Sequence, residues 1–386
     1  MDVIDDDRDV LEAGRSPWGA RLLTVVVAVV AVVLGLGRTG DPAPPPPPAP
    51  RVSTPPAPPV PMPSAPPPAE ADPRPVELAG AGPVLPGGRG EVAWLRTARA
   101  VLAVDLGTGR VLRTPVRLPV PGGSSALIAG PDGVLVLDAD PRRAGAAALV
   151  WGELPAGPAW RFGRSRTVLP GPGSSLYLAD QPGEDRTRFF RVLFNGADLP
   201  GTVPAEGGRV TSDGRGGLLQ EDRRGLWRLG EDGRTQLSTG RLLAVGPNHL
   251  LISECGPWHY CVQVLLDQRT GERRAVPGWP RDAADPGRIS PDGRRVAVVV
   301  RGRDRAQLQL VATDRSWPVA VWDEQSALAV EPASTFAFSA DGSSLLAVHG
   351  GRLLVVDALT GRSRPADLGQ AEGERLLQLS LAPAQD

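Results

Sequence analysis

The chain has 386 residues, a formal net charge of -1 at neutral pH, 43 prolines and 47 glycines. This length holds one large domain or two average ones, each large enough to bury a core without disulfides. Because a nearly neutral chain lacks the basic excess that releases counterions from phosphates, we expect no nucleic-acid partner. The chain also has no lysine, which excludes lysine Schiff-base and lysine general-base chemistry.

The first distinctive segment is an apolar run near the N-terminus. Residues 22–37 are uncharged, and Trp18 stands where an interfacial aromatic residue belongs, so the segment approaches the ~20 residues needed to cross a bilayer. We predict a short acidic cytoplasmic tail over 1–17 and a transmembrane helix over 18–37. A cleaved signal peptide is the alternative, but no A-x-A site directly follows Gly37 and the tail is acidic.

The next segment, 38–77, is dominated by proline. Proline lacks an amide hydrogen, so this segment favours extended polyproline II structure, which rises ~3.1 Å per residue. We predict a spacer that holds the following domain away from the membrane. A ligand for proline-recognition domains is the alternative.

From residue 78 onward, short runs rich in Val and Leu alternate with Gly, Asp and Pro turns, the pattern of an all-β domain. A turn resembling Gly/Ser-Pro-Asp-Gly recurs every 35 to 49 residues, and an apolar run follows each copy. The copies are Gly130–Gly133, Gly171–Ser174, Thr211–Gly214, Gly246–His249, Ser290–Gly293 and Ser339–Gly342, with a suspected earlier member at Pro86. The spacing suits a four-stranded propeller blade of ~40 to 45 residues.

A second turn, of the form D-x-x-T-G, follows some of these copies. It occurs at Asp105–Arg110, Asp267–Glu272 and Asp357–Arg362. Asp, Thr and Gly at these offsets predict a hairpin turn in which the glycine takes a left-handed conformation.

These motifs carry a resemblance to known propellers. ISPDGRRVAVVV (289–300) and FSADGSSLLAV (338–348) resemble the repeats of TolB-like propellers, and the D-x-x-T-G turn is similar to that of YVTN-type and quinoprotein-like propellers. The resemblance implies an all-β propeller over 78–386 with six to seven four-stranded blades, seven preferred. We expect LLQLSLAP (376–383) to pair with the first blade and close the ring, which removes exposed strand edges.

Two cysteines lie close together in this domain. Cys255 and Cys261 enclose GPWHY at the tip of a predicted hairpin, and in an exported domain such a pair forms a disulfide. We therefore predict an extracytoplasmic location. A metal site formed by both thiolates and His259 is the alternative.

The same loop offers a candidate binding surface, because it presents Trp258, His259 and Tyr260 and aromatic side chains dominate protein contacts. Packing of these side chains beneath the hairpin is the alternative. The nine tryptophans also allow a sugar-binding face, although Trp between blades explains them as well.

Recognisable catalytic motifs are missing from the sequence. It contains no H-E-x-x-H, no G-x-S-x-G and no P-loop, and its three histidines are scattered. We predict a non-catalytic cell-surface module without cofactor or metal, which binds or scaffolds a protein or cell-envelope ligand. The alternative is a propeller enzyme, such as a hydrolase, a lactonase or a quinoprotein-like enzyme, that uses the central channel.

Overall fold

A computed structural model of the chain shows its architecture. It describes residues 76–382 except 81, 86–87, 89, 116–124, 131–132, 140–145, 152–159, 163–166, 181–185, 195–196, 257–259, 278–285, 302–305, 316–317, 325–334 and 372. These residues belong to one compact unit, Pro67–Asp386. The predicted tail, the predicted transmembrane helix and almost all of the predicted spacer lie outside them. Within the described part of the chain, no helix has the length and apolar character to cross a bilayer.

The described residues form short antiparallel sheets. The first sheet contains β1 (Val76–Leu78), β2 (Val92–Thr97), β3 (Ala100–Asp105), β4 (Val111–Pro115) and β29 (Leu376–Leu381), and the second β5 (Ser125–Gly130), β6 (Gly133–Ala139), β7 (Ala146–Trp151) and β8 (Trp160–Phe162). The third contains β9 (Val168–Pro170), β10 (Ser175–Asp180), β11 (Thr187–Leu193) and β12 (Asp198–Ala205), and the fourth β13 (Arg209–Ser212), β14 (Leu218–Asp222), β15 (Gly225–Gly230) and β16 (Gly233–Ser238).

The remaining strands form two further sheets. One contains β17 (Arg241–Val245), β18 (His249–Cys255), β19 (Cys261–Asp267), β20 (Arg273–Val276), β21 (Gly287–Ile289), β22 (Arg295–Arg301), β23 (Ala306–Ala312) and β24 (Pro318–Glu324). The other contains β25 (Phe336–Phe338), β26 (Ser344–His349), β27 (Arg352–Asp357) and β28 (Ser363–Pro365), and a short 3-10 helix, η2 (Gly369–Ala371), precedes β29.

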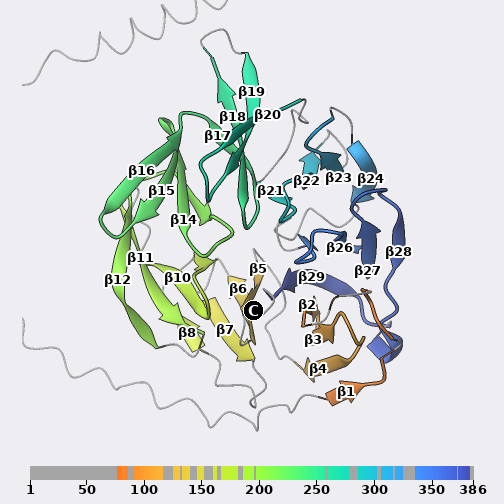
Figure 1. The fold of residues 1–386 in the computed structure, drawn as a ribbon. Coiled ribbons are helices and arrows are strands. Elements are labelled where there is room, and N and C mark those ends of the chain that lie inside the picture. Colours follow the sequence, from red (N-terminus) through yellow and green to blue (C-terminus); the bar gives the residue numbers. More distant parts are fainter. Residues whose placement is uncertain are drawn as a thin grey trace, which may run out of the picture. The chain divides into compact units, whose positions relative to one another are not determined.

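Seven similar units make up these sheets. The eight-stranded sheet is two four-stranded units joined edge to edge by a short parallel pairing of β17 with β21, which aligns Ala244 with Gly287. Each unit contacts the next one. β29 contacts β5, β5 contacts β9, β9 contacts β13 and β15 contacts β17. β17 then contacts β21, β21 contacts β25, and β25 contacts β29 again. The units therefore form a closed ring around a common centre (Figure 1). The fold is a seven-bladed β-propeller.

The ring closes as the sequence predicts. β29 pairs with β2 in antiparallel register, with Ser380 opposite Trp94, so the innermost strand of the first blade comes from the end of the domain. β1 adds a fifth strand on the outer edge of the same blade by pairing with β4. It begins at Val76, two residues before the start expected for the domain, and Glu77 forms an ion pair with Arg110.

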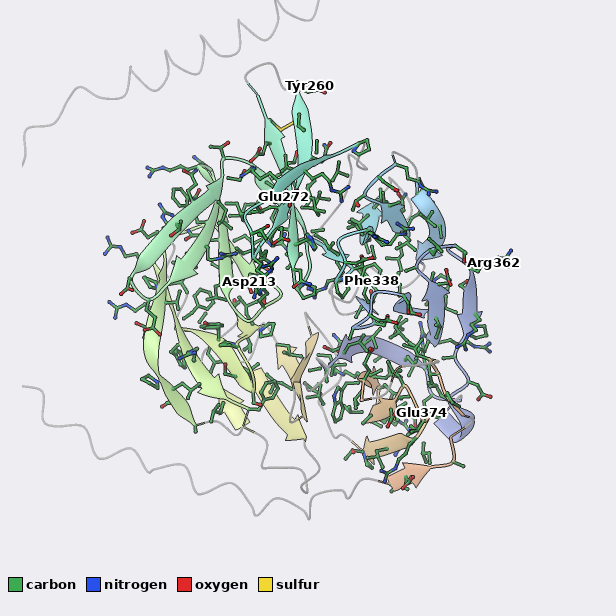
Figure 2. All side chains as sticks on the ribbon, in the orientation of Figure 1. Asp213, Tyr260, Glu272, Phe338, Arg362 and Glu374 are labelled. Atoms are coloured by element: carbon green, nitrogen blue, oxygen red, sulfur yellow. A yellow bond between two sulfur atoms is a disulfide. The ribbon has the colours of Figure 1, made fainter. Side chains whose placement is uncertain are left out.

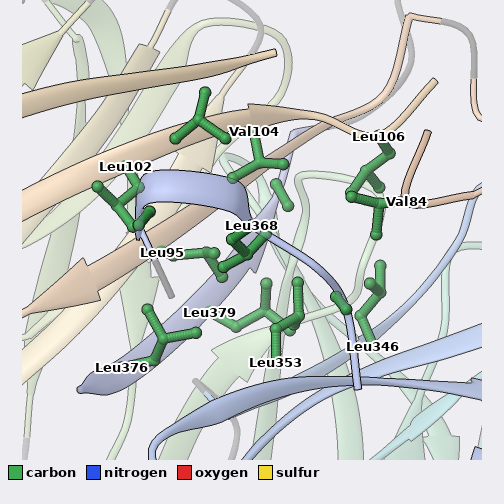
Figure 3. Packing of buried hydrophobic residues seen from close by; sticks show 14 of the residues in the cluster. Val84, Leu95, Leu102, Val104, Leu106, Leu346, Leu353, Leu368, Leu376 and Leu379 are labelled. Carbon is green, nitrogen blue, oxygen red and sulfur yellow. The ribbon is translucent and has the colours of Figure 1, made fainter. Parts of the chain in front are cut away.

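The core is divided among the spaces between blades. Successive side chains of a strand point to opposite faces, so each strand packs against both neighbouring blades. In the fifth blade, Leu250 and Ile252 belong to the cluster shared with the fourth blade, and Leu251 belongs to the cluster shared with the sixth. At the closure, Leu95, Leu376 and Leu379 pack with side chains of the seventh blade (Figure 3). Burial on both faces explains why the apolar runs are continuous.

The repeated turns all lie on one rim of the ring. The Pro-Asp-Gly-like turns connect the first strand of a blade to the second, and the D-x-x-T-G turns connect the third to the fourth. In an antiparallel meander these connections share one end, which we call the turn rim. The glycines of the second turn are left-handed, as predicted, with φ of 74° at Gly109, 75° at Gly271 and 72° at Gly361.

One hydrogen bond recurs in four blades. The N–H of the residue after the third strand donates to the carbonyl of the residue before the second. The pairs are Leu106 to Glu91 (3.0 Å), Gln268 to Asn248 (2.8 Å), Thr313 to Arg294 (3.0 Å) and Ala358 to Ser343 (2.9 Å). Glu91 thus occupies the equivalent position in the first blade; the predicted earlier member at Pro86 lies partly outside the described residues.

Candidate binding site

Several polar side chains of the turn rim join neighbouring blades. In three successive pairs of blades, an arginine donates to the residue that follows the third strand of the next blade. These hydrogen bonds run from Arg228 to Gln268 (3.0 Å), from Arg274 to Thr313 (3.0 Å) and from Arg295 to Ala358 (2.7 Å). Asn248 likewise donates to the carbonyl of Pro291 in the next blade (3.0 Å). Because each of these groups bridges two blades, the rim has a structural explanation.

Several titrating groups of this rim have a shifted pKa, which hydrogen bonds within the turns or burial at the closure explain. Backbone N–H groups of Thr270 and Arg269 hold the pKa of Asp267 below its ordinary value, and the backbone and side chain of Thr360 do the same for Asp357. Burial raises the pKa of Glu91, which lies at the ring closure. Shifted groups can mark a catalytic centre, but these three belong to turns and to the closure.

The opposite rim carries the connection between the second and third strands of the fifth blade. Other connections of this type in the described residues are two-residue turns, at Ala98–Arg99, Arg223–Arg224 and Gly350–Gly351. The connection between β18 and β19 instead spans 256–260, and this hairpin extends well past the neighbouring blades in Figure 1. We call residues 254–256 and 260–262 the hairpin tip.

A disulfide joins the two strands of the hairpin tip. Cys255 and Cys261 stand directly opposite each other, with their Cα atoms 3.9 Å apart, as the sequence predicts for an exported domain. Both sulfur atoms take part in the disulfide, so neither is a thiolate ligand in this structure. His249 lies at the other end of β18 and packs against Gly293 of the next blade.

The hairpin tip extends beyond its flanking strands. β17 begins at Arg241, opposite Ser253. β20 ends opposite Gln263, and Pro277 follows directly. Beyond these positions only β18 and β19 continue, and the N–H of Gly256 donates to the carbonyl of Tyr260 (2.9 Å). The tip is therefore a two-stranded ribbon.

One face of this ribbon exposes apolar side chains. The Gly256–Tyr260 hydrogen bond continues the ladder by one position, so alternation places Tyr260 on the same face as Val262. Tyr260 is 75% exposed and Val262 36%. Tyr260 stands at the end of the hairpin, beside the disulfide (Figure 2). A large exposed aromatic residue with an apolar neighbour is the composition of a protein contact.

The base of this face is fixed to the neighbouring blade. Glu254, opposite Val262, accepts hydrogen bonds from Ser238 of the fourth blade and from Arg273 of β20. Arg273 also donates to the carbonyl of Leu237 (3.2 Å). These contacts orient the ribbon relative to two blades, so the apolar pair has a defined position.

Only one of the three predicted loop residues is among the described residues. Tyr260 is exposed, whereas Trp258 and His259 lie outside the described residues. Val262 and the Glu254–Arg273 contact were not predicted, although the alternation of side chains along β19 would have placed Val262 beside Tyr260.

The described residues of the hairpin tip carry groups that can make contacts. Among them, no group of three or more His, Cys, Asp and Glu side chains is arranged to hold a metal ion. The hairpin tip contributes one phenol, one aliphatic side chain and an ion pair.

Comparisons with known proteins leave the activity open. No protein-family profile matches the chain, and no curated protein matches it. Among solved structures, a candidate 6-phosphogluconolactonase from Bacteroides uniformis is 13% identical, with 76% of this chain and 100% of that chain covered and a TM-score of 0.49.

Two further structures share the fold. TolB from Acinetobacter baumannii is 12% identical, with 77% of this chain and 67% of that chain covered and a TM-score of 0.40. The WD40 domain of Toxoplasma gondii coronin is 12% identical, with 74% and 77% covered and a TM-score of 0.42. These structures include one protein named as an enzyme and two that are not, so they indicate no activity for this chain.

Proposed function

We propose that this protein is an extracytoplasmic binding module that contacts a protein partner through its hairpin tip. Residues 18–37 anchor it in the cell membrane, and the proline-rich spacer, which ends before β1 begins at Val76, sets the distance between membrane and propeller. The observation that carries the proposal is the disulfide-bonded ribbon on which Tyr260 and Val262 are exposed side by side. A disulfide is typical of an oxidising compartment, which supports the extracytoplasmic location.

The shape of the tip favours a protein over a small ligand. Small molecules bind in concave pockets that enclose most of their surface, whereas the tip is a projecting ribbon (Figure 1). A projecting aromatic residue instead fits a depression on a partner protein, where its burial gives it a large share of the binding energy. Fixing the ribbon by the disulfide and by Glu254 reduces the entropy lost on binding.

Site-specific crosslinking tests this proposal. A photoreactive phenylalanine analogue replaces Tyr260 in the full-length chain, and intact cells are irradiated. We expect a discrete covalent adduct with a protein of the cell envelope. The matched control places the same analogue at Leu359, which is 72% exposed in the turn between β27 and β28 on the turn rim. Absence of an adduct at 260, or the same adducts from both positions, would contradict the proposal.

Protease treatment of intact cells tests the extracytoplasmic location of the propeller independently. Protease added to intact cells should cut the propeller domain but leave a membrane-bound N-terminal fragment of the full-length chain. Protection of the domain until the cells are lysed would show that it faces the cytoplasm, and the extracytoplasmic part of the proposal would then be wrong.

A further inference from the structure

We infer that the Cys255–Cys261 disulfide is a redox switch for the hairpin tip: a dithiol reductant opens it, the tip loses its fixed shape, and the ring keeps its fold. The inference rests on the proposed function, because it concerns control of the same contact. Its structural part is separable, because order in the tip is measurable without a partner.

The disulfide lies where the hairpin has least other support. Past Ser253 and Gln263, neither β17 nor β20 accompanies the ribbon. Only the pairs Glu254–Val262 and Cys255–Cys261, together with the hydrogen bond from Gly256, hold its two strands together. A two-stranded ribbon without further strands is marginally stable in water. Glu254 also accepts hydrogen bonds from Ser238 and Arg273, but these contacts hold only the β18 side of the tip. The covalent link therefore holds the end of β19 in place.

The lower half of the same hairpin is independent of the disulfide. Leu250, Leu251 and Ile252 are fully buried, and they pack in the clusters shared with both neighbouring blades. Strands flank this half on both sides. Opening the disulfide thus frees the tip without removing a contact from the core of the ring.

The disulfide is also accessible to a reductant. Cys255 is exposed at the end of β18, with the Ser253 hydroxyl oxygen 3.9 Å from its Sγ. A thiolate of the dithiol attacks Cys255 Sγ, the S–S bond breaks, and Cys261 leaves as a thiolate that takes a proton from water. The second thiol of the reductant then attacks the mixed disulfide and releases Cys255 as a thiol. The dithiol is oxidised by two electrons and the protein is reduced by two.

Hydrogen exchange of the full-length chain in detergent, with and without dithiothreitol, tests the switch. On reduction we expect the amides of Glu254, Gly256 and Val262 to exchange at least about 10-fold faster, while those of Leu250 and Ile252 keep their rates. The Tm of the propeller should fall by less than about 5 °C, because the closed loop is short and the domain large. Unchanged exchange in the tip, or a disulfide that dithiothreitol reduces only in denaturant, would overturn the inference.

Two double variants separate covalent linkage from packing. In Cys255→Ser with Cys261→Ser, tip exchange should be fast with or without dithiothreitol, and slow exchange in this variant would overturn the inference. In Cys255→Val with Cys261→Val, a cross-strand apolar pair should restore part of the protection, and dithiothreitol should have no effect on it. If the oxidised protein gives no crosslink from position 260, the proposed function is wrong. The exchange experiment still tests the switch, because it needs no partner.

Discussion

Arg295 shows at the scale of one residue why arginine connects the blades. It is 8% exposed, its Nε donates to the carbonyl of Ala358 (2.7 Å), and its NH1 donates to the carbonyl of Arg294 (3.0 Å). The planar guanidinium reaches both acceptors at once, which an ammonium group on a flexible stem does not reproduce. We predict that Arg295→Lys lowers the free energy of unfolding by about 2 kcal/mol, as measured by denaturant titration.

The neighbouring residue provides the control for this prediction. The side chain of Arg294 is 80% exposed, and its contact with Asp292 is a 3.8 Å surface ion pair, an arrangement that contributes little to stability. Arg294→Lys should change the free energy of unfolding by less than about 0.5 kcal/mol. Equal effects of the two substitutions would show that burial of the guanidinium is irrelevant.

Glu91 gives the ring closure a pH dependence of its own. Burial raises its pKa above the ordinary 4.5, the N–H of Ala340 lowers it in part, and the charge of Asp341 raises it further. Since the folded pKa exceeds the unfolded one, folding takes up a proton as the pH falls from the folded value towards 4.5. The contribution of Glu91 to stability is therefore largest below that window and smallest at neutral pH.

Glu91→Gln should remove this dependence. The amide oxygen still accepts from Ala340, but the buried charge beside Asp341 is gone, so we predict a higher Tm than wild type at pH 7. The difference should shrink as the pH falls towards 4.5. Thermal unfolding of both proteins at several pH values measures it, and two parallel curves would refute the assignment.

At the scale of the element, the D-x-x-T-G turns allow backbone strain to be separated from steric clash. Gly271 has a φ of 75° and open space where a Cβ would stand. Gly373 has the same open space but no positive φ. Gly109 has a φ of 74°, and a Cβ there would clash with the backbone of Gly82. The left-handed conformation costs an L-residue about 1 to 2 kcal/mol.

Alanine at the three positions should therefore give graded effects. We predict no measurable loss of unfolding free energy for Gly373→Ala, a loss of about 1 kcal/mol for Gly271→Ala and more than about 2 kcal/mol for Gly109→Ala. Denaturant titrations of the three variants give the comparison. A loss at Gly271 no larger than at Gly373 would mean that the turn relaxes without strain.

The turns also show how far the sequence predicts the fold. Left-handed glycines and strand-ending aspartates demand particular residue types, so the repeat and the positions of the second strands were predictable. The arginine contacts at Arg228 and Arg295 were not, because they end on a side-chain oxygen and a backbone carbonyl of sequence-distant residues. β1 was missed because it is three residues long, follows a proline-rich tract, and forms only by pairing with β4.

The candidate site was predictable to a similar degree. The short spacing of Cys255 and Cys261 is enough to predict a disulfide, and the aromatic residues between them predict a contact loop. The exposure of Val262 depends instead on how far β20 accompanies β19. Strand length relative to a neighbour is a tertiary property, and Pro277 was the only local signal for it.

At the scale of the whole molecule, closure depends on a strand supplied from the far end of the domain. Leu376 and Leu379 of β29 are 3% and 1% exposed, and they pack against both the first and seventh blades. The ion pair between Arg113 and Glu374 and the hydrogen bond from Arg364 to the carbonyl of Val84 bring the two ends of the domain together at the same place.

Truncation after Arg375 should therefore open the ring. Loss of β29 leaves the ladder edge of β2 and the apolar cluster beside it uncovered, and an uncovered edge is a template for pairing with another chain. We predict that the truncated propeller elutes as dimers and larger species in size-exclusion chromatography, with a Tm well below that of wild type. The control, Leu377→Ala, changes a partly exposed β29 side chain and should leave a monomer-sized peak in place. A truncated protein with the elution volume and Tm of wild type would show that the blades close without the terminal strand.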